Sequence, residues 1–256
     1  MSTLEKSKQP TFCTQHSPVP DNIRSTFLYR MENITDSVSW LKNPPGHATC
    51  IRHLLEHNHD PDLSVDYSRY AEAFSSAFFA KHYLKSLLAF HALPDTIKYA
   101  LSVRPFIDLG SGAGPAAYAS LTLPALNQPS ISLVDQSAEQ LKLARDIFCH
   151  ATVPTEFFRC HFPHDAVFQN AAICMSYFLC ENDYELSHLL NSSKFIDSNV
   201  IIVIDHREVL RRVRQHLSQL NASVLLSSET YDLDAPLQSI VGQATITVNA
   251  LSSIPG

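Results

Sequence analysis

Hydrophobic and polar positions change their pattern once along this chain, near residue 104. Before that point apolar residues recur at the three- and four-residue spacing of helices, most regularly over residues 66–93. The spacing also predicts a helix from residue 22 through Met31, with Asp21 or Asn22 as its cap, and another around residues 51–55. A short helix capped by Asp95 should lead into the rest of the chain.

After residue 104 short apolar runs alternate with helical stretches. Strands are predicted at residues 106–109, 131–134, 156–162, 171–175, 199–204, 223–227 and 244–251, and helices at 115–121, 138–148, 183–190 and 209–220. Such alternation predicts an α/β fold with a doubly wound, mostly parallel sheet, here of seven strands. No helical pattern separates the last two strands, so we expect an antiparallel hairpin at one edge.

This pattern divides the chain into three parts. Residues 1–21 are polar and contain proline, which is typical of a mobile tail. Residues 22–100 form a helical cap or lid, and residues 101–256 form the core domain. A chain of 256 residues can bury such a core without disulfides or metals.

Charge and cysteine content narrow the class of protein. The formal net charge is −6, which disfavours nucleic acid as a partner because binding to phosphates depends on Lys and Arg. No apolar run is long enough for a membrane span, and the first residues lack the apolar core of a secretory signal. None of the six cysteines forms a C-x-x-C pair, so we expect free thiols and a cytoplasmic location. Whether two copies form a homodimer stays open.

A glycine-rich loop is the most specific feature. The chain has 6 glycines, and Gly110, Gly112 and Gly114 fall within five positions between a predicted strand and a predicted helix. Glycine at such a turn permits positive φ and lets a ligand approach the backbone closely. Ligands of open α/β sheets bind at the carboxyl ends of the strands, where this loop lies. A tight turn without a ligand is the alternative.

The loop and its surroundings read Asp108-Leu-Gly-Ser-Gly-Ala-Gly114. This D-x-G-x-G-x-G pattern resembles motif I of class I, Rossmann-like S-adenosylmethionine-dependent methyltransferases. An acid beside the loop suits the cationic methionine end of that cofactor and would repel the pyrophosphate of NAD. The resemblance covers residues 104–251 and implies a Rossmann-like methyltransferase core.

The resemblance also assigns candidate cofactor contacts. Asp135 follows the second core strand, where the family has an acid that accepts hydrogen bonds from both ribose hydroxyls. Its alternative role is the N-cap of the helix from Ala138, which Ser137 could fill instead. The candidate cofactor-binding residues are Asp108, Gly110, Ser111, Gly112, Gly114, Asp135, Gln136, His161, Phe162, Ser176 and Tyr70. The adenine contact could also come from Cys160, or from Asp165 after a shift in register.

Two residues are candidates for the transfer step. His206 directly follows the fifth core strand and could act as a base, or else orient the next helix. Tyr177, after the fourth core strand, could face cofactor and substrate or only pack under the cap, with Glu181 as a more distant option. Tyr67, Tyr70 and Phe74 could cover the sulfonium through cation–π attraction, or pack as ordinary helix residues.

Metal is not expected. His53 and His57 share a helix face at a spacing that can ligate a metal, but a solvated helix end explains them as well.

We therefore expect a methyltransferase that acts on O or N of a small molecule or short peptide. The alternatives are an RNA or ribosome-linked methyltransferase, which residues 176–181 loosely resemble, and a cofactor-binding scaffold without catalysis. An NAD-linked dehydrogenase is a further option that the glycine spacing disfavours.

Overall fold

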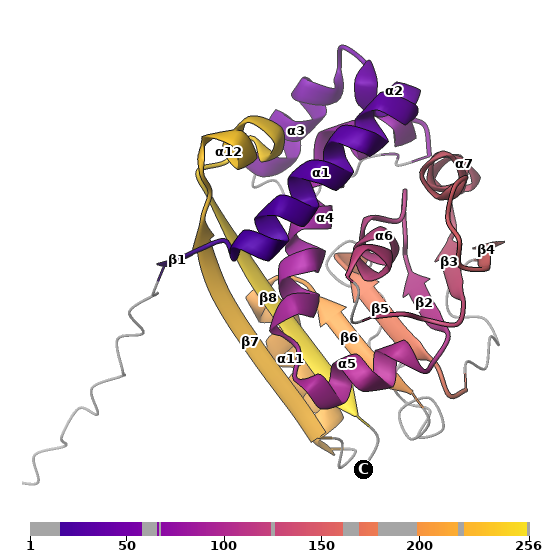
Figure 1. Ribbon diagram of the computed structural model, residues 1–256, viewed down its shortest axis with the longest axis vertical. Coiled ribbons are helices and arrows are strands. Elements are labelled where there is room, and N and C mark those ends of the chain that lie inside the picture. The colour runs from indigo at the N-terminus through magenta and orange to yellow at the C-terminus, as the bar shows by residue number, and fades with distance from the viewer. Residues whose placement is uncertain are drawn as a thin grey trace, which may run out of the picture.

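The computed structural model describes residues 16–57, 66, 68–123, 126–160, 169–178, 199–219 and 223–254. These residues form an α/β fold around one mixed eight-stranded sheet, in the order β1-β7-β8-β6-β5-β2-β3-β4 (Figure 1). The strands are β1 (His16–Pro18), β2 (Phe106–Leu109), β3 (Ile131–Asp135), β4 (Thr155–Arg159), β5 (Ala172–Ser176), β6 (Val200–Ile204), β7 (Ser223–Asp232) and β8 (Thr245–Ile254).

The helices of the described ranges follow the sequence pattern in most places. They are α1 (Asp21–Ser37), α2 (Ser39–Lys42), α3 (Ala48–His57), α4 (Ala71–Ala92), α5 (Asp95–Ser102), α6 (Pro115–Thr122), α7 (Ala138–Phe148), α11 (Arg207–Gln219) and α12 (Ala235–Val241). Helix α7 has the predicted bounds, whereas α4 begins five residues later than predicted, and α2 and α12 were not predicted at all. The helix predicted at 183–190 lies outside the described residues.

The predicted caps of α1 and α5 are wrong. Pro20 and Pro94 occupy the N-cap positions, and neither makes a side-chain cap hydrogen bond. Asp21 and Asp95 lie instead in the first helical turn, where a carboxylate is favoured by the partial positive charge of the helix N-terminus.

Five neighbouring strands, β6, β5, β2, β3 and β4, are parallel. From β2 the chain moves outward to β3 and β4, and then returns to β5 on the other side of β2. This reversal leaves a crevice at the carboxyl ends of β2 and its neighbours, which is where ligands of such sheets bind. Strand β8 runs antiparallel to both β6 and β7, so the predicted pairing of the last two strands is confirmed.

The eighth strand corrects the prediction of a seven-stranded sheet. His16, Ser17 and Pro18 pair in parallel with Thr230–Asp232 of β7, so these residues are not part of a mobile tail. Nδ1 of His16 lies 3.1 Å from Oδ1 of Asp232. Three residues are too few for an alternating pattern, and the strand forms because β7 offers its unpaired edge to them.

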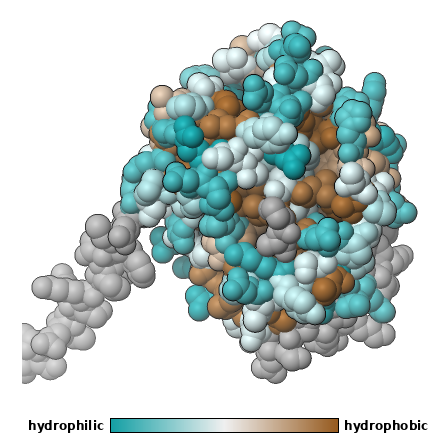
Figure 2. Space-filling view, viewed as in Figure 1, coloured by the Kyte–Doolittle hydropathy of each residue, from teal (hydrophilic) through white to brown (hydrophobic). Residues whose placement is uncertain are grey.

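Two hydrophobic layers cover the sheet. Alternate residues of β6 point to opposite faces, so Ile202 belongs to a hydrophobic cluster that includes residues of α1, α4, α6 and α7, whereas Val203 belongs to a second cluster that includes Val213 and Leu217 of α11. Helix α4 lies at the centre of the first layer, against α1, α3, α6 and α7 (Figure 1). Hydrophilic residues cover much of the outer surface on this side, with apolar residues visible between them (Figure 2). No helix within the described ranges has the length and apolar character needed to cross a membrane.

Helix α4 is also joined to its neighbours by polar contacts. Arg52 of α3 donates to the backbone carbonyl of Ala77, and its guanidinium fills the space beside Gly242, at the end of α12. Lys81 of α4 and Glu56 of α3 form an ion pair of 2.6 Å whose side chains are mostly buried. These contacts fix α4 relative to α3 and to the C-terminal part of the sheet.

Candidate functional site

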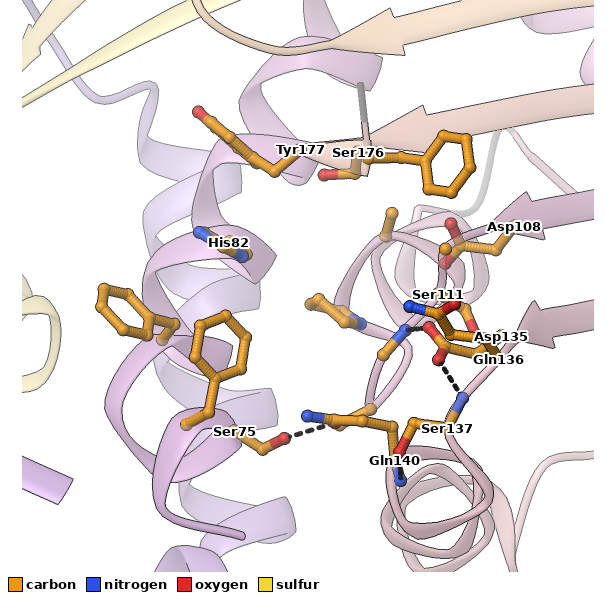
Figure 3. A pocket seen from close by; sticks show the side chains of 18 of the residues that line it. Ser75, His82, Asp108, Ser111, Asp135, Gln136, Ser137, Gln140, Ser176 and Tyr177 are labelled. Carbon is orange, nitrogen blue, oxygen red and sulfur yellow. Dashed lines mark hydrogen bonds between the residues drawn. The ribbon is translucent and has the colours of Figure 1, made fainter. Parts of the chain in front are cut away.

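A cavity of about 320 Å³ lies between α4 and the carboxyl ends of β2, β3 and β5 (Figure 3). The loop after β2 and the ends of β3 and β5 form one side, and the N-terminal half of α4 forms the other. Its lining residues are Asp66, Ser68, Phe74, Ser75, Phe78, Phe79, His82, Asp108, Gly110–Ala113, Pro115, Ala116, Val134–Ser137, Gln140, Cys160 and Ser176–Phe178.

The glycine loop makes the floor of this cavity because it turns tightly against β3. The backbone N–H groups of Gly110 and Ser111 both donate to the carbonyl of Val134, at 2.9 and 3.1 Å. All three glycines have positive φ, as predicted. Gly114 is the N-cap of α6 with φ of 82°, and a Cβ there would lie 2.6 Å from Leu133 and 2.8 Å from Phe148.

Asp108 is a buried carboxyl group at the end of β2. Its Oδ2 accepts a hydrogen bond of 3.0 Å from the backbone N–H of Ala117, in the first turn of α6. Its Oδ1 has no hydrogen-bond partner among the described residues. Burial raises the pKa of Asp108 to about 7, with a further rise from the charge of Asp135, although the bond from Ala117 opposes it. A cationic ligand group in the cavity would satisfy Oδ1 and favour the ionised form.

Asp135 connects the glycine loop to α7. Its Oδ2 accepts from the N–H of Gly112 and its Oδ1 accepts from the N–H of Ser137, each at 2.8 Å (Figure 3). Burial raises the pKa of Asp135, and these two bonds oppose the rise. Asp135 is not the cap of α7, because Ser137 fills the N-cap position and its Oγ accepts from the N–H of Gln140.

Rings and cations meet at the other end of the cavity. The Tyr177 backbone has a φ of 55°, and its ring stacks on the His82 imidazole at 4.6 Å between centroids. Lys85 Nζ donates to the Tyr177 hydroxyl at 2.5 Å. Figure 3 shows this hydroxyl pointing away from the glycine loop. Burial, and then the charges of Lys85, Lys81 and His206, lower the pKa of His82 to about 3.

Most predicted site residues meet at this cavity. Those that line it are Asp108, Gly110, Ser111, Gly112, Asp135, Gln136, Ser176 and Tyr177, together with the alternative adenine contact Cys160. His161, Phe162, Asp165, Tyr67 and Glu181 lie outside the described residues.

Three predicted residues are not among the lining residues. Gly114 faces the packed side chains beneath the loop. Tyr70 contacts His47 edge to face at 5.9 Å, although Phe74 from the same predicted lid does line the cavity. The ring of His206 lies 5.6 Å from that of Tyr177, in an edge-to-face arrangement.

Sequence reasoning missed the polar residues that α4 and α7 contribute. Ser75 Oγ donates to Gln140 Oε1 at 2.8 Å across the cavity wall, and His82 extends between the Phe78 and Tyr177 rings (Figure 3). The spacing of Phe74, Phe78 and His82, four residues apart, was the available signal, because such residues share one helix face.

The described residues contain no group of three or more His, Cys, Asp or Glu side chains arranged for a metal. The side chain of His57, part of the His53 and His57 pair, is not described.

No protein-family model matches the chain, and no curated protein matches its sequence. Solved structures do match its fold. A chain from the complex between the Haloferax volcanii Trm112 methyltransferase activator and a protein provisionally described as a methyltransferase has a TM-score of 0.55 and 11% identity, and the match covers 76% of this chain and 100% of that one.

A protein from Methanococcus maripaludis, provisionally described as an S-adenosylmethionine-dependent methyltransferase, matches with a TM-score of 0.53 and 12% identity. This match covers 76% of the present chain and 97% of the other. The chain therefore has the fold of Rossmann-like S-adenosylmethionine-dependent methyltransferases, as its glycine loop predicted.

Proposed function

We propose that this protein binds S-adenosylmethionine in the cavity and transfers its methyl group to O or N of a small molecule or short peptide. The observation that carries the proposal is the pair of carboxyl groups beside the glycine loop, of which Asp108 is buried and Asp135 is partly buried. Burying such groups is costly unless they bind a partner, and Asp108 Oδ1 has none among the described residues.

Each carboxyl group suits a different part of the cofactor. Asp108 would accept from the α-ammonium group, directly or through water, because a cation offsets the desolvation of this carboxylate. Asp135 would accept from the ribose hydroxyls, since a carboxylate oxygen can accept another hydrogen bond beside those from the N–H groups of Gly112 and Ser137. Gln136 and Cys160, with His161 and Phe162 further along, would surround the adenine.

The remaining lining residues would position the reacting end. The cofactor supplies an electrophilic methyl group, and the protein's task is to align the acceptor atom with it. Ser176 ends β5 and Tyr177 follows it, and both line the cavity. His206 does not line the cavity and its ring lies 5.6 Å from that of Tyr177, so acting as a base would require the residues at this end of the site to rearrange.

The helices before β2 would act as a cap over this site. Phe74, Phe78 and His82 of α4 close the side of the cavity opposite the strand ends. We accordingly divide the chain into an N-terminal segment of residues 1–21, whose residues 16–18 join the sheet, a cap of residues 22–100 that includes Tyr70, and a core of residues 101–256. A wall so close to the site suits a small acceptor better than a polynucleotide. We also propose that the protein is cytoplasmic and that it forms a homodimer.

Calorimetry with S-adenosylmethionine, S-adenosylhomocysteine and NAD tests the cofactor. We expect both adenosyl compounds to bind the wild type, Asp135→Ala to lose this binding, and NAD not to bind. Binding of NAD alone, or of no adenosyl compound, would overturn the proposal.

A second measurement separates an enzyme from a scaffold. Extracts incubated with the protein and methyl-labelled cofactor should yield a labelled small product. Tight binding without any labelled product from small-molecule, peptide or RNA fractions would favour a non-catalytic scaffold, and label found only in RNA would favour the RNA-modifying alternative.

A further inference from the structure

The wall that α4 contributes is made of stacked rings. The rings of Phe78 and His82 stack at 5.8 Å between centroids with an interplanar angle of 28°, and those of His82 and Tyr177 stack at 4.6 Å with 12°. All three residues line the cavity. Because the ring faces cover one another, the cavity meets ring edges, which carry the positive end of the aromatic quadrupole.

Positive side chains gather behind this wall. Lys85 Nζ donates to the Tyr177 hydroxyl and lies 4.7 Å from the centroid of that ring. Burial, and then the charges of Lys85, Lys81 and His206, lower the pKa of His82 and so favour its neutral form. Lys81 also forms an ion pair with Glu56. His82 is therefore neutral near pH 7 and cannot keep a proton taken from an acceptor.

The cavity is thus divided by charge. Asp108 and Asp135 place two carboxyl groups on the side of the glycine loop, whereas the rings of His82 and Tyr177 lie on the opposite side (Figure 3). Lys85 does not line the cavity, and it brings a cation to the hydroxyl of Tyr177 on that side. A cationic cofactor is favoured beside the carboxyl groups. An acceptor beside the rings is favoured if it is electron-rich or anionic, and disfavoured if it is an ammonium group.

We propose that the acceptor is a flat hydroxyaromatic molecule, a phenol, which lies against the Phe78, His82 and Tyr177 rings and reacts through its ionised oxygen. The inference rests on the proposed function and gives its substrate class. A phenol matches both properties of the wall, because its π face meets ring edges and its oxygen becomes an anion without needing a strong base nearby.

The transfer balances without a further reactant. The phenol proton leaves to water, a lone pair of the phenolate oxygen forms the new O–CH₃ bond, and the S–CH₃ bond breaks with its electron pair left on sulfur. Both charges disappear in this step. A site that holds the ions apart from bulk water therefore favours the reaction more than water does.

The test uses 4-nitrophenol, whose ionisation changes its visible absorbance, and 4-nitroaniline, which has the same shape with an amine in place of the hydroxyl. Each is titrated into the full chain saturated with S-adenosylhomocysteine, which has no methyl group to transfer. We expect the pKa of bound 4-nitrophenol to fall by about one unit, a tenfold preference for the anion. We expect 4-nitroaniline to bind at least tenfold more weakly.

Lys85→Met should abolish the pKa shift while the affinity for S-adenosylhomocysteine stays within twofold. Lys42→Met, which removes an exposed charge in α2, is the matched control and should keep the shift. If Lys85→Met fails to fold, Tyr177→Phe keeps the ring, removes the hydroxyl that Lys85 contacts, and should reduce the shift in the same way.

Failure to bind 4-nitrophenol, an unchanged or raised pKa of the bound phenol, or equal binding of 4-nitroaniline would overturn the inference. Failure of the proposed function is seen separately, as absence of S-adenosylhomocysteine binding by the wild type. The nitrophenol titration is then repeated without that ligand and still reports on the ring wall.

Discussion

Asp135 holds the backbone N–H of Gly112 with a hydrogen bond of 2.8 Å, so the ribose-binding candidate also shapes the loop next to it. Replacing Asp135 by Ala should therefore have two effects. The unfolding free energy should fall by about 1–3 kcal/mol because the N–H groups of Gly112 and Ser137 lose their acceptor. The affinity for S-adenosylhomocysteine should fall by roughly 100-fold, since hydrogen bonds to a charged group are worth about 1.5–3 kcal/mol each.

Urea unfolding and calorimetry measure these two effects separately. Asp135→Asn keeps one acceptor oxygen. Its unfolding free energy and its affinity for S-adenosylhomocysteine should both lie between those of the wild type and of the Ala variant. Asp146 is an exposed acid on α7, and Asp146→Ala is the matched control, which should change neither stability nor affinity. A variant Asp135→Ala that binds the ligand normally would show that Asp135 only shapes the loop.

Gly114 should tolerate no side chain. Gly114→Ala places a Cβ within 2.8 Å of both Leu133 and Phe148 at a residue whose φ is 82°. The left-handed backbone costs roughly 1–2 kcal/mol and overpacking roughly 1–3 kcal/mol, so we expect the unfolding free energy in urea to fall by about 2–5 kcal/mol. At Gly46 a Cβ would meet nothing within 4 Å, and Gly46→Ala should change stability by less than about 0.5 kcal/mol. Equal stabilities of the two variants would contradict the packing described for the loop.

The raised pKa of Asp108 predicts a pH dependence of stability without ligand. The unfolded chain ionises this group near its ordinary pKa of 3.8, whereas the folded protein ionises it near 7. Between these values the folded state binds more protons, so stability falls as the pH rises, and it levels off above the folded pKa. The raised pKa of Asp135 acts with the same sign.

Asp108→Asn should remove much of this slope, because an amide does not ionise. The measurement is the unfolding free energy from urea titrations at pH 5, 6, 7 and 8 for both proteins. The difference between the two curves should change by a few kcal/mol over this range. Parallel curves would mean that Asp108 is ionised throughout and has a partner beyond the described residues.

Ser75 and Gln140 join α4 to α7 by one buried hydrogen bond, and a double-mutant cycle measures it. Ser75→Ala and Gln140→Leu should each lower the unfolding free energy, and their effects should be non-additive by about 1 kcal/mol. Calorimetry should also show weaker cofactor binding in both single variants, since both residues line the cavity. Additive effects on stability would mean that the bond does not link the two helices.

The core strands and the floor of the site could be predicted from sequence because their signals are local. Strands β2 and β6 are each predicted by a few consecutive, mostly apolar residues, and β6 is buried at every position. The glycine loop is also local, since positive φ at Gly110, Gly112 and Gly114 depends mainly on the residues themselves.

The opposite wall and the sheet edge depend on contacts between distant residues. Periodicity shows that His82 shares a face with Phe78, but the partner Tyr177 lies 95 residues later and is fixed only by the packing of α4 on the strand ends. Strand β1 forms because His16 pairs with Thr230 of β7, which is distant in the sequence. Helix α12 was missed because its seven residues are too short to establish a helical period between two strand patterns.

The bond from Arg52 to Ala77, and the contact of the same guanidinium with Gly242, hold α4 in place through atoms that do not line the cavity. The Phe78 and His82 rings on α4 are therefore held in place without help from a ligand, and ligand binding does not have to offset the entropy cost of ordering that helix. Binding of a ligand to these rings should therefore give a modest negative heat-capacity change, as expected for a preformed surface. A large negative change would be expected if folding were coupled to binding.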